Sequence, residues 1–238
     1  KGMQKTSWLL YGFAAFFVSL FGYIYYTYET TRNEIITHVD NKLFNAAVSV
    51  KHILGDDYHD RVNAGLAISP AVYKEKSRAL SEYAKQMQLA YVYAMVKRDD
   101  TVYFSASSYT QKDQNTGKVT EFFDIYPEAT ELNKEAFNST EPVYEISQDQ
   151  WGYFKSIFVT FVDNNGQTYI TGADITLSDF NQQLQYSVTR AAITACFFFF
   201  IAVLIAGLYF LQLKRSLSTD ARTGFANHVA LEYYLKKT

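Results

Sequence analysis

The segments SWLLYGFAAFFVSLFGYIYY (Ser7–Tyr26) and AAITACFFFFIAVLIAGLYFL (Ala191–Leu211) decide how this chain of 238 residues is organised. Neither segment contains a charged residue, and each is about 20 residues long, the length of a membrane-spanning helix. The chain between them is polar and ordinary in composition. The sequence therefore predicts transmembrane helices at residues 7–26 and 190–212, with one domain, residues 27–189, between them on one side of a bilayer.

The distribution of charge predicts which side of the bilayer holds this domain. The flanking residues 1–6 and 213–238 carry seven Lys or Arg against two acidic residues. Between Glu29 and Asp179 there are 22 acidic residues against 14 Lys or Arg, an excess of eight negative charges. Because basic flanks stay in the cytoplasm, both termini are predicted to be cytoplasmic and the domain extracytoplasmic. A cleaved signal peptide is the competing interpretation of the first segment, but that segment is long for one and lacks a small-x-small cleavage site.

The composition also excludes several classes of function. The acidic domain would repel phosphate groups, so we expect no nucleic acid partner. The single cysteine, Cys196, lies in the second apolar segment, so we expect no disulfide in the domain. The histidines His38, His52 and His59 are scattered along the chain, and no cluster of Cys or His predicts a metal site.

The hydrophobic pattern predicts that the first half of the domain is helical. Apolar residues at three- and four-residue steps indicate a long helix over Tyr28–Leu54 that continues out of the first span and ends at Gly55. This helix can pack on its own domain, on a dimer partner or on both. A second helix, Ala71–Met87, follows the start signal Ser69-Pro70.

The pattern then changes to the two-residue period of β-strands. Two strand pairs are predicted, and the second is joined by the hairpin turn Asn164-Asn165-Gly166. Between the pairs we expect a polar loop, Gln111–Gly117, and a short helix, Glu128–Phe137, while a last helix, Leu177–Val188, enters the second span. The four predicted strands are Ala90–Val96, Thr101–Ser107, Trp151–Asp163 and Thr168–Ile175. The predicted fold class is α+β, with helices beside an antiparallel sheet.

Three short motifs in this order resemble a single Cache domain, the PAS-like extracytoplasmic sensor of bacterial receptors. They are Trp151-Gly152-Tyr153 at the start of a strand, Asn165-Gly166 in a turn, and Thr171-Gly172-Ala173-Asp174-Ile175 just before the last helix. The resemblance covers roughly residues 28–185. It implies a small-molecule sensor domain, periplasmic and anchored in the bacterial inner membrane, with the ligand held between the sheet and a loop that crosses it.

Strand alternation indicates which side chains would face such a ligand. The eight candidate ligand-binding residues are Tyr103, Ser105, Ser107, Tyr126, Trp151, Tyr153, Lys155 and Asp174. Lys155 would bind a carboxylate, Asp174 would bind an amine, and the rings would exclude water, which suits a small organic acid or zwitterion. The alternative for the aromatic residues is plain core, and for Lys155 a solvated position. The Arg that precedes a Trp-Tyr pair in amino-acid-binding double Cache domains is missing, so the sequence does not identify the ligand.

Residues 219–228, after the second span, resemble the opening of a GGDEF domain. In that family an Asp, two residues and Thr-Gly lead through an apolar residue to an Asn. The matching residues are Asp220, Thr223, Gly224 and Asn227. Arg222, Phe225 and His228 depart from the usual Leu, Leu and Arg. An ordinary amphipathic helix after a polar turn is the competing interpretation.

This second resemblance implies a diguanylate cyclase, an enzyme that makes cyclic di-GMP from two GTP molecules with Mg²⁺. The catalytic residues of such a domain would lie beyond Thr238, so we expect this chain to carry no catalytic residue of its own. GTP and Mg²⁺ would then be needed by the missing output domain and not by the chain itself. The alternative is a degenerate GGDEF domain followed by an EAL phosphodiesterase, and the departures at Arg222, Phe225 and His228 favour it.

The activity of GGDEF domains requires two of them face to face, so the resemblance also implies a homodimer. The helix Tyr28–Leu54 and the short connector Gln212–Ser218 suit a parallel pair. We expect ligand binding to act through Leu177–Val188 and to shift the second span relative to its twin. A chemoreceptor or a histidine kinase would continue with a HAMP helix pair or a long heptad helix, and neither pattern is seen before Thr238. A membrane-anchored binding receptor without enzymatic output is the other alternative.

Overall fold

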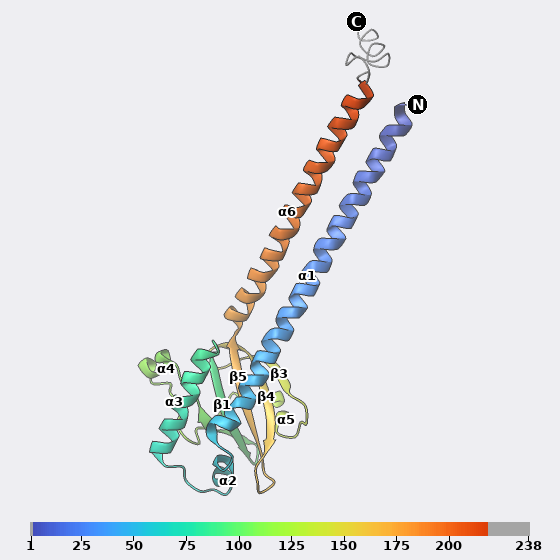
Figure 1. Cartoon of the computed structure of the whole chain (residues 1–238). Helices are drawn as coiled ribbons and strands as arrows, with labels where there is room; N and C mark the ends of the chain where they lie inside the picture. Colours follow the sequence, from blue (N-terminus) through green and yellow to red (C-terminus); the bar gives the residue numbers. More distant parts are fainter. Residues whose placement is uncertain (1, 219–238) are drawn as a thin grey trace. The chain divides into compact units, whose positions relative to one another are not determined.

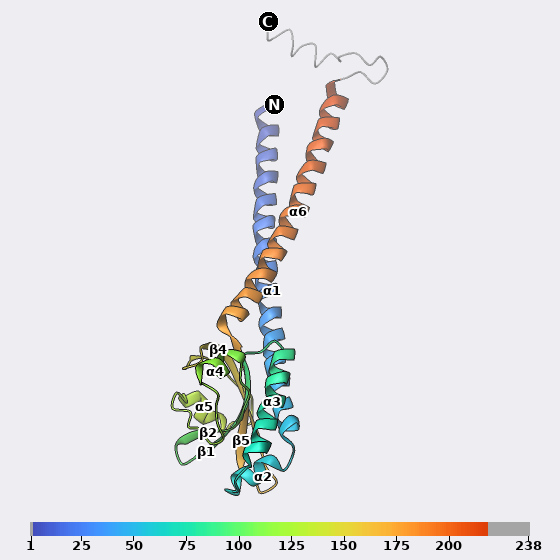
Figure 2. The same cartoon turned by 90° about the vertical axis from the view of Figure 1, so that its left-hand side faces the viewer.

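The computed structural model describes residues 2–218, and two long helices are its most visible elements (Figures 1 and 2). These are α1 (Gly2–Leu54) and α6 (Leu177–Ser218). The chain forms two compact units. One is Arg32–Tyr186, and the other contains the chain up to Thr31 and from Ser187 onward.

The unit formed by the two ends of the chain is helical, and aromatic side chains link its helices. The rings of Phe16 in α1 and Phe199 in α6 stack with their centroids 5.2 Å apart. Among the residues that the structure describes, one helical stretch, Leu177–Gln212, is long and apolar enough to cross a membrane, and it contains the second predicted span. The first predicted span is helical, but several of its side chains are not described, so this span stays a prediction.

The unit Arg32–Tyr186 is built on a five-stranded antiparallel sheet, which confirms the α+β class. Its strands are β1 (Tyr91–Arg98), β2 (Thr101–Ser107), β3 (Val143–Gln148), β4 (Tyr153–Val162) and β5 (Thr168–Thr176). Their order across the sheet is β2-β1-β5-β4-β3. The turn between β4 and β5 is the predicted one, with Gly166 at a φ of 81° that favours glycine. Four of the strands were predicted, and β3 is an additional edge strand that the sequence pattern did not reveal.

One face of the sheet is covered by helices (Figure 2). The second half of α1 lies on it together with α3 (Pro70–Gln86), and α2 (Tyr58–Asn63) lies at the end of the same layer. Most of the predicted apolar stripe of α1 is fully buried here, at Val39, Leu43, Ala46, Val50 and Leu54. A hydrogen bond of 2.8 Å from Thr171 Oγ1 to the carbonyl oxygen of Ala47 joins α1 to β5. The predicted stripe therefore packs on its own domain.

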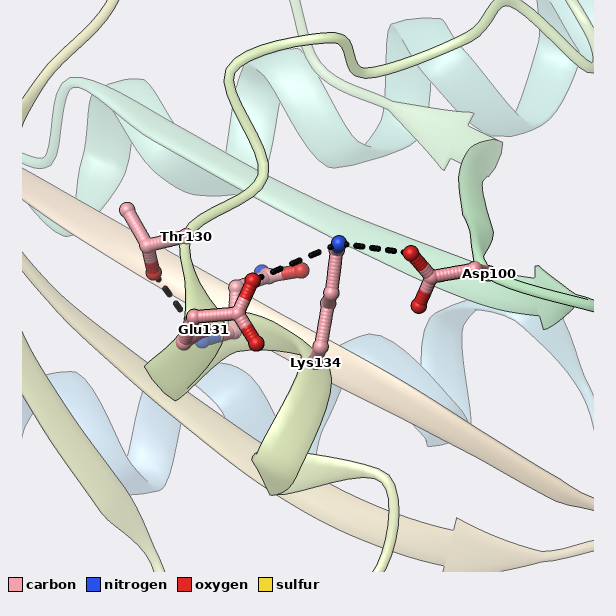
Figure 3. Close-up of polar contacts among 5 residues, drawn as sticks. Asp100, Thr130, Glu131 and Lys134 are labelled. Carbon is pink, nitrogen blue, oxygen red and sulfur yellow. Dashed lines mark hydrogen bonds and ion pairs between the residues drawn. The ribbon is translucent and has the colours of Figure 1, made fainter.

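The opposite face of the sheet carries shorter elements. The helix α5 (Glu131–Ala136) begins at Thr130, whose Oγ1 accepts a hydrogen bond from the backbone N–H of Asn133. Figure 3 shows how Lys134 joins this helix to the turn between β1 and β2: its Nζ lies 3.0 Å from Asp100 Oδ2 and 3.5 Å from Glu131 Oε1. The helix α5 covers one part of this face, where Ala136 and Phe137 are buried in the core. Loops cover the rest of the face.

One predicted loop on this face is a helix, α4 (Gln111–Thr116). The prediction of a polar loop for Gln111–Gly117 was wrong because Thr110 and Asp113 form a capping box that begins a helix. Thr110 Oγ1 accepts from the N–H of Asp113, and the Asp113 carboxylate accepts from the N–H of Thr110. This reciprocal pair satisfies two otherwise unpaired N–H groups at the helix start, and Gly117 closes the helix at a φ of 69°.

Candidate ligand-binding cavity

A cavity lies between this second face of the sheet and the loops that cross it. Its lining comes from β1, from β2 and the residue after it, from α4, from the loop between α4 and α5, from the turn before β4 and from β5. The lining residues are Tyr91, Tyr93, Met95, Phe104, Ser107, Ser108, Asp113, Lys118, Thr120, Tyr126, Asp149, Trp151 and Asp174. The hollow measures about 370 Å³ including its mouth to solvent, but only about 20 Å³ of it is free for a water molecule. That is room for about one water, so side chains almost fill the cavity.

Three tyrosine–aspartate pairs line the cavity. The hydroxyl of Tyr93 donates to Asp174 Oδ1 at 2.8 Å, and that of Tyr126 donates to Asp149 Oδ2 at 3.1 Å. The third pair joins Tyr91 to Asp113, with distances of 3.0 and 3.1 Å to the two carboxylate oxygens. Burial, reinforced by neighbouring carboxylates, raises the pKa of each tyrosine hydroxyl, so all three stay protonated and act as donors.

Asp174 is one of two almost completely buried carboxyl groups of the cavity, the other being Asp113, which is 3% exposed. Only 5% of the surface of Asp174 is exposed. Burial raises the pKa of the Asp174 carboxyl to about 7; hydrogen bonds from Ser156 and Tyr93 oppose this shift, and the charges of Asp149 and Glu145 add to it. The group therefore exchanges its proton near neutral pH, and a charged ligand beside it would move that equilibrium.

Gly172 makes room for the ring that holds Asp174. Gly172 in β5 faces Tyr93 in β1 in the sheet register. A Cβ atom at position 172 would lie 2.2 Å from Cε2 of the Tyr93 ring, which is far inside contact distance. The absence of a side chain at this position lets Tyr93 lie flat over β5 and reach Asp174.

The turn before β4 forms the cover of the cavity. Asp149 Oδ1 accepts hydrogen bonds from the backbone N–H groups of Trp151 and Gly152, and this fixes the turn. Trp151 Nε1 donates to the carbonyl oxygen of Lys118 at 3.0 Å, while Lys118 Nζ donates to the carbonyl oxygen of Gln150 at 2.8 Å. One of these exposed hydrogen bonds is donated by the turn and the other by the loop after α4, and together they join the turn to that loop.

Four of the eight predicted ligand-binding residues line this cavity, namely Ser107, Tyr126, Trp151 and Asp174. The other four, Tyr103, Ser105, Tyr153 and Lys155, lie elsewhere. Tyr103 packs on Phe123 in the core on the helix side, and Ser105 contacts His59 there. Tyr153 is 52% exposed.

A β-bulge explains why Tyr103 and Ser105 are separated from Ser107. The register between β1 and β2 shifts at Ala94 and Met95, where Ala94 faces Ala106 but Met95 faces Phe104. The extra residue, Ser105, reverses the alternation of faces. The prediction that Tyr103, Ser105 and Ser107 share a face was therefore wrong, because strict alternation does not hold across a bulge.

Lys155 lies on the face of β4 that is turned toward α1 and not toward the cavity. Its Nζ is 2.8 Å from Asp40 Oδ1 of α1. It also lies over the rings of Tyr144 and Phe180, 5.7 and 5.4 Å from their centroids. Its neighbours thus belong to α1, β3 and the first turns of α6.

The prediction missed several residues of the cavity, in particular Tyr91, Tyr93, Asp113, Lys118 and Asp149. Asp113 could have been found from the spacing of Thr110 and Asp113, which is that of a capping box. Tyr91 and Tyr93 lie two residues apart in the predicted first strand, so alternation could have placed both on one face. Lys118 and Asp149 carry no such signal, because their proximity results from the way the loops fold back across the sheet.

His59 is a buried titratable residue on the opposite face of the sheet. Its ring stacks on that of Tyr169 with centroids 3.6 Å apart, and its Nε2 is 3.0 Å from Ser105 Oγ. Burial lowers the pKa of His59 to about 3, although the nearby carboxylates of Asp163 and Asp60 act in the opposite direction. His59 is therefore neutral in the folded protein throughout the physiological range.

We expect His59 and Asp174 to make opposite contributions to stability as pH changes. The folded pKa of His59 lies below its unfolded value of 6.5, so its contribution is present above pH 6.5 and is lost as pH falls toward 3. The folded pKa of Asp174 lies above its unfolded value of 3.8, so its contribution is present below pH 3.8 and is lost as pH rises through 7. Each slope reaches up to about 1.4 kcal/mol per pH unit, and the two oppose each other between pH 4 and 6.5.

Single variants separate these two contributions. With His59→Gln, the thermal denaturation midpoint of the full chain in nanodiscs should fall as pH rises from 4.5 to 6.5. With Asp174→Asn, the midpoint should rise over the same range. If the thermal midpoint changed with pH in the same direction in both variants, the opposite contributions assigned to His59 and Asp174 would be wrong.

No family model matches the sequence, and a comparison with curated proteins found no match either. Among solved structures, the chain is similar to the sensory domain of the Campylobacter jejuni chemoreceptor Tlp3 (CcmL), with 12% identity and a TM-score of 0.43. The similarity covers 66% of this chain and 60% of that one. One Tlp3 structure holds L-valine, and another holds isoleucine.

Two further solved structures are similar to this chain. The Escherichia coli DcuS sensor domain has 14% identity and a TM-score of 0.38, covering 66% of this chain and 98% of that one. An extracellular ligand binding receptor from Desulfohalobium retbaense has 16% identity and a TM-score of 0.42, covering 68% of this chain and 26% of that one. These structural neighbours are thus bacterial sensory domains and a ligand-binding receptor.

Proposed function

We propose that this chain is the sensing part of a membrane receptor in the bacterial inner membrane. In this proposal Arg32–Tyr186 binds a small molecule in the cavity, and α6 carries the response to the cytoplasm. The observation that carries it is the position of Asp174. This buried carboxyl group lies in β5 only three residues before α6 begins at Leu177.

The contacts around the start of α6 support this route. Thr176, the last residue of β5, accepts a hydrogen bond at its Oγ1 from the N–H of Asp179 and so begins the helix. Phe180, in the first turn, is buried against the core on the helix side and lies beside Lys155. In β4, Lys155 is followed directly by Ser156, which hydrogen bonds to Asp174. A displacement of Asp174 would reach α6 both along β5 and through β4.

The cytoplasmic output in this proposal is the production of cyclic di-GMP by a GGDEF domain that uses GTP and Mg²⁺. Its support is the motif Asp220, Thr223, Gly224 and Asn227, which lies outside the described residues. Because two GGDEF domains must meet, the receptor would act as a homodimer, with both long helices crossing the bilayer. The alternative output, a degenerate GGDEF domain with an EAL phosphodiesterase, is supported by Arg222, Phe225 and His228 in place of the usual residues.

Ligand binding can be tested through the tryptophan in the cover. The chain has two tryptophans, so Trp8→Phe leaves Trp151 as the single fluorophore. We expect a screen of small amines, acids and amino acids against this variant in nanodiscs to yield at least one compound that changes Trp151 emission and raises the thermal midpoint. Trp151→Phe is the matched control and should show no emission change. If no compound acts, the proposed sensing role is wrong.

Transmission to α6 can be tested with Cys196, the single cysteine of the chain. In a parallel homodimer the two Cys196 residues are related by symmetry, and oxidative cross-linking reports their separation. We expect a compound that binds the cavity to change the cross-linking yield of the full chain, and Asp174→Asn to remove that change. A yield that stays the same with every bound compound would contradict the proposed route. GTP turnover by the intact gene product, with and without the compound, tests the output.

A further inference from the structure

The cavity contains an excess of negative charge. Asp113, Asp149 and Asp174 line it, while the only Lys, Arg or His among its lining residues is Lys118. The Lys118 ammonium is exposed at the rim and donates to the carbonyl oxygen of Gln150. Lys155, which the sequence suggested for a carboxylate, pairs with Asp40 outside the cavity. No cation inside the described cavity is therefore placed to receive an anionic group.

Three aromatic rings stand together in the same cavity. Phe104 lies 5.3 Å from Tyr126 and 5.9 Å from Trp151 between ring centroids, and Tyr126 lies 6.5 Å from Trp151. The ring planes are inclined to one another at 60°, 85° and 36°. Rings arranged at such angles form walls that attract a cation through their π faces and accept its alkyl groups.

We propose that the ligand is a small organic cation, with its ammonium group beside Asp174 and its alkyl part against Phe104, Tyr126 and Trp151, and that small carboxylates are rejected. This inference rests on the proposed sensing function and specifies the chemical class of its ligand. The buried Asp174 and the three rings both favour a cation. An anionic ligand would lie beside the carboxylates of Asp174 and Asp149, and no positive charge inside the cavity would offset their repulsion.

Binding requires the cover to move. A free volume of about 20 Å³ holds about one water molecule, and an alkylammonium ion is several times larger. The contacts that close the cover are the two hydrogen bonds between Trp151, Lys118 and Gln150, all near the surface. Outward rotation of Trp151 breaks its exposed hydrogen bond to Lys118 and its contacts with the rings of Phe104 and Tyr126, so ligand entry should change the emission of Trp151.

The class of ligand also sets the direction of proton exchange. The charged groups that face Asp174 are Asp149 from the cover and Glu145 from β3, with the neutral hydroxyls of Tyr93 and Tyr126 beside it. Because burial raises the pKa of the Asp174 carboxyl to about 7, its neutral and ionised forms are both present near neutral pH. A cation favours the ionised form and releases protons, whereas an anion favours the neutral form and takes protons up.

Two probes of similar size and opposite charge test the proposal. Propylammonium and propionate are titrated into the Trp8→Phe full chain in nanodiscs, with Trp151 emission and calorimetry in two buffers of different ionisation enthalpy as readouts. For propylammonium we expect a Kd of about 10 mM or tighter, given its four heavy atoms, with proton release. Propionate should bind at least tenfold more weakly. Tighter binding of propionate, proton uptake, or no binding of propylammonium would overturn the inference.

Two variants sharpen the test. Asp174→Asn keeps an acceptor for the Tyr93 hydroxyl, and it should weaken propylammonium at least tenfold and abolish proton release. Lys118→Met removes the cation of the rim together with one hydrogen bond of the cover. In this variant propionate should still bind at least tenfold more weakly than propylammonium, whereas a carboxylate site would lose its ligand. If the broad screen yields a ligand but propylammonium does not bind, only the ligand class is wrong. If neither binds, the sensing function fails as well.

Discussion

Gly172→Ala should destabilise the domain by about 2–4 kcal/mol and abolish binding in the cavity. The added Cβ would lie 2.2 Å from the ring of Tyr93. Overpacking of this kind costs about 1–3 kcal/mol, and a buried hydrogen bond that loses its partner costs a similar amount. The ring cannot move away from Gly172 without breaking its hydrogen bond of 2.8 Å to Asp174. Urea denaturation of the full chain in nanodiscs, followed by Trp151 emission, measures the loss.

Two comparisons show whether the ring contact is the cause. Gly166 has a φ of 81° and open space around it, so Gly166→Ala should cost about 1 kcal/mol through backbone strain alone and leave binding unchanged. In the double variant with Tyr93→Leu, the ring that the new methyl group meets is gone, so the total loss should be smaller than the sum of the single losses. Strict additivity would refute the steric explanation.

Asp40→Ala should destabilise the domain by about 2–3 kcal/mol and uncouple α6 from the cavity. The variant leaves the ammonium of Lys155 without its partner at a site where its side chain is only 12% exposed. An unpaired buried charge costs more than an exposed one, while the partial exposure of Asp40 (26%) moderates the loss. Lys155 also contacts Tyr144 and Phe180, so its displacement would loosen β4, α1 and the start of α6 together.

A double-mutant cycle isolates this ion pair. Lys155→Met keeps most of the alkyl packing on the rings and removes the charge, and the double variant removes both charges. We expect a coupling energy of about 1–2 kcal/mol and a double variant that is more stable than Asp40→Ala alone. The exposed pair of Lys134 and Asp100 is the control, and its removal should have little effect. A coupling energy near zero would show that Lys155 does not join these elements.

Local patterns predicted the elements well because their causes are local. The apolar stripe of α1 and the start signal Ser69-Pro70 of α3 mark helices through side-chain spacing and capping. Asn164-Asn165-Gly166 marks the hairpin between β4 and β5 through backbone preference. The strand β3 was not predicted because its six residues alternate only between half-buried and exposed positions at the edge of the sheet, so the alternation of apolar and polar residues is weak. The helix α4 was not predicted because its polar composition resembles that of a loop.

The candidate site was predicted in part. Asp174, Trp151, Tyr126 and Ser107 line the cavity, and each was named from its place on a strand or on the crossing loop. Lys155 was predicted to face the ligand, but it lies on the face of β4 that α1 covers. Alternation groups the residues of a strand by face, and it does not tell which distant element covers each face. A bulge of one residue at Ser105 was enough to exchange the faces of β2.

The sequence by itself determined the class of the molecule: two long apolar segments, an acidic α+β domain between them, and a carboxylate in the last strand before the second segment. These features depend on composition and on periods of two to four residues. Only the tertiary structure decided the chemistry of the cavity. In the folded chain Tyr91, Tyr93 and Tyr126 donate hydrogen bonds to aspartates 22, 81 and 23 residues away. Lys155 lies on the face of the sheet opposite to the cavity. Such contacts arise from strand order and from loops that fold back over the sheet, and no local pattern encodes them.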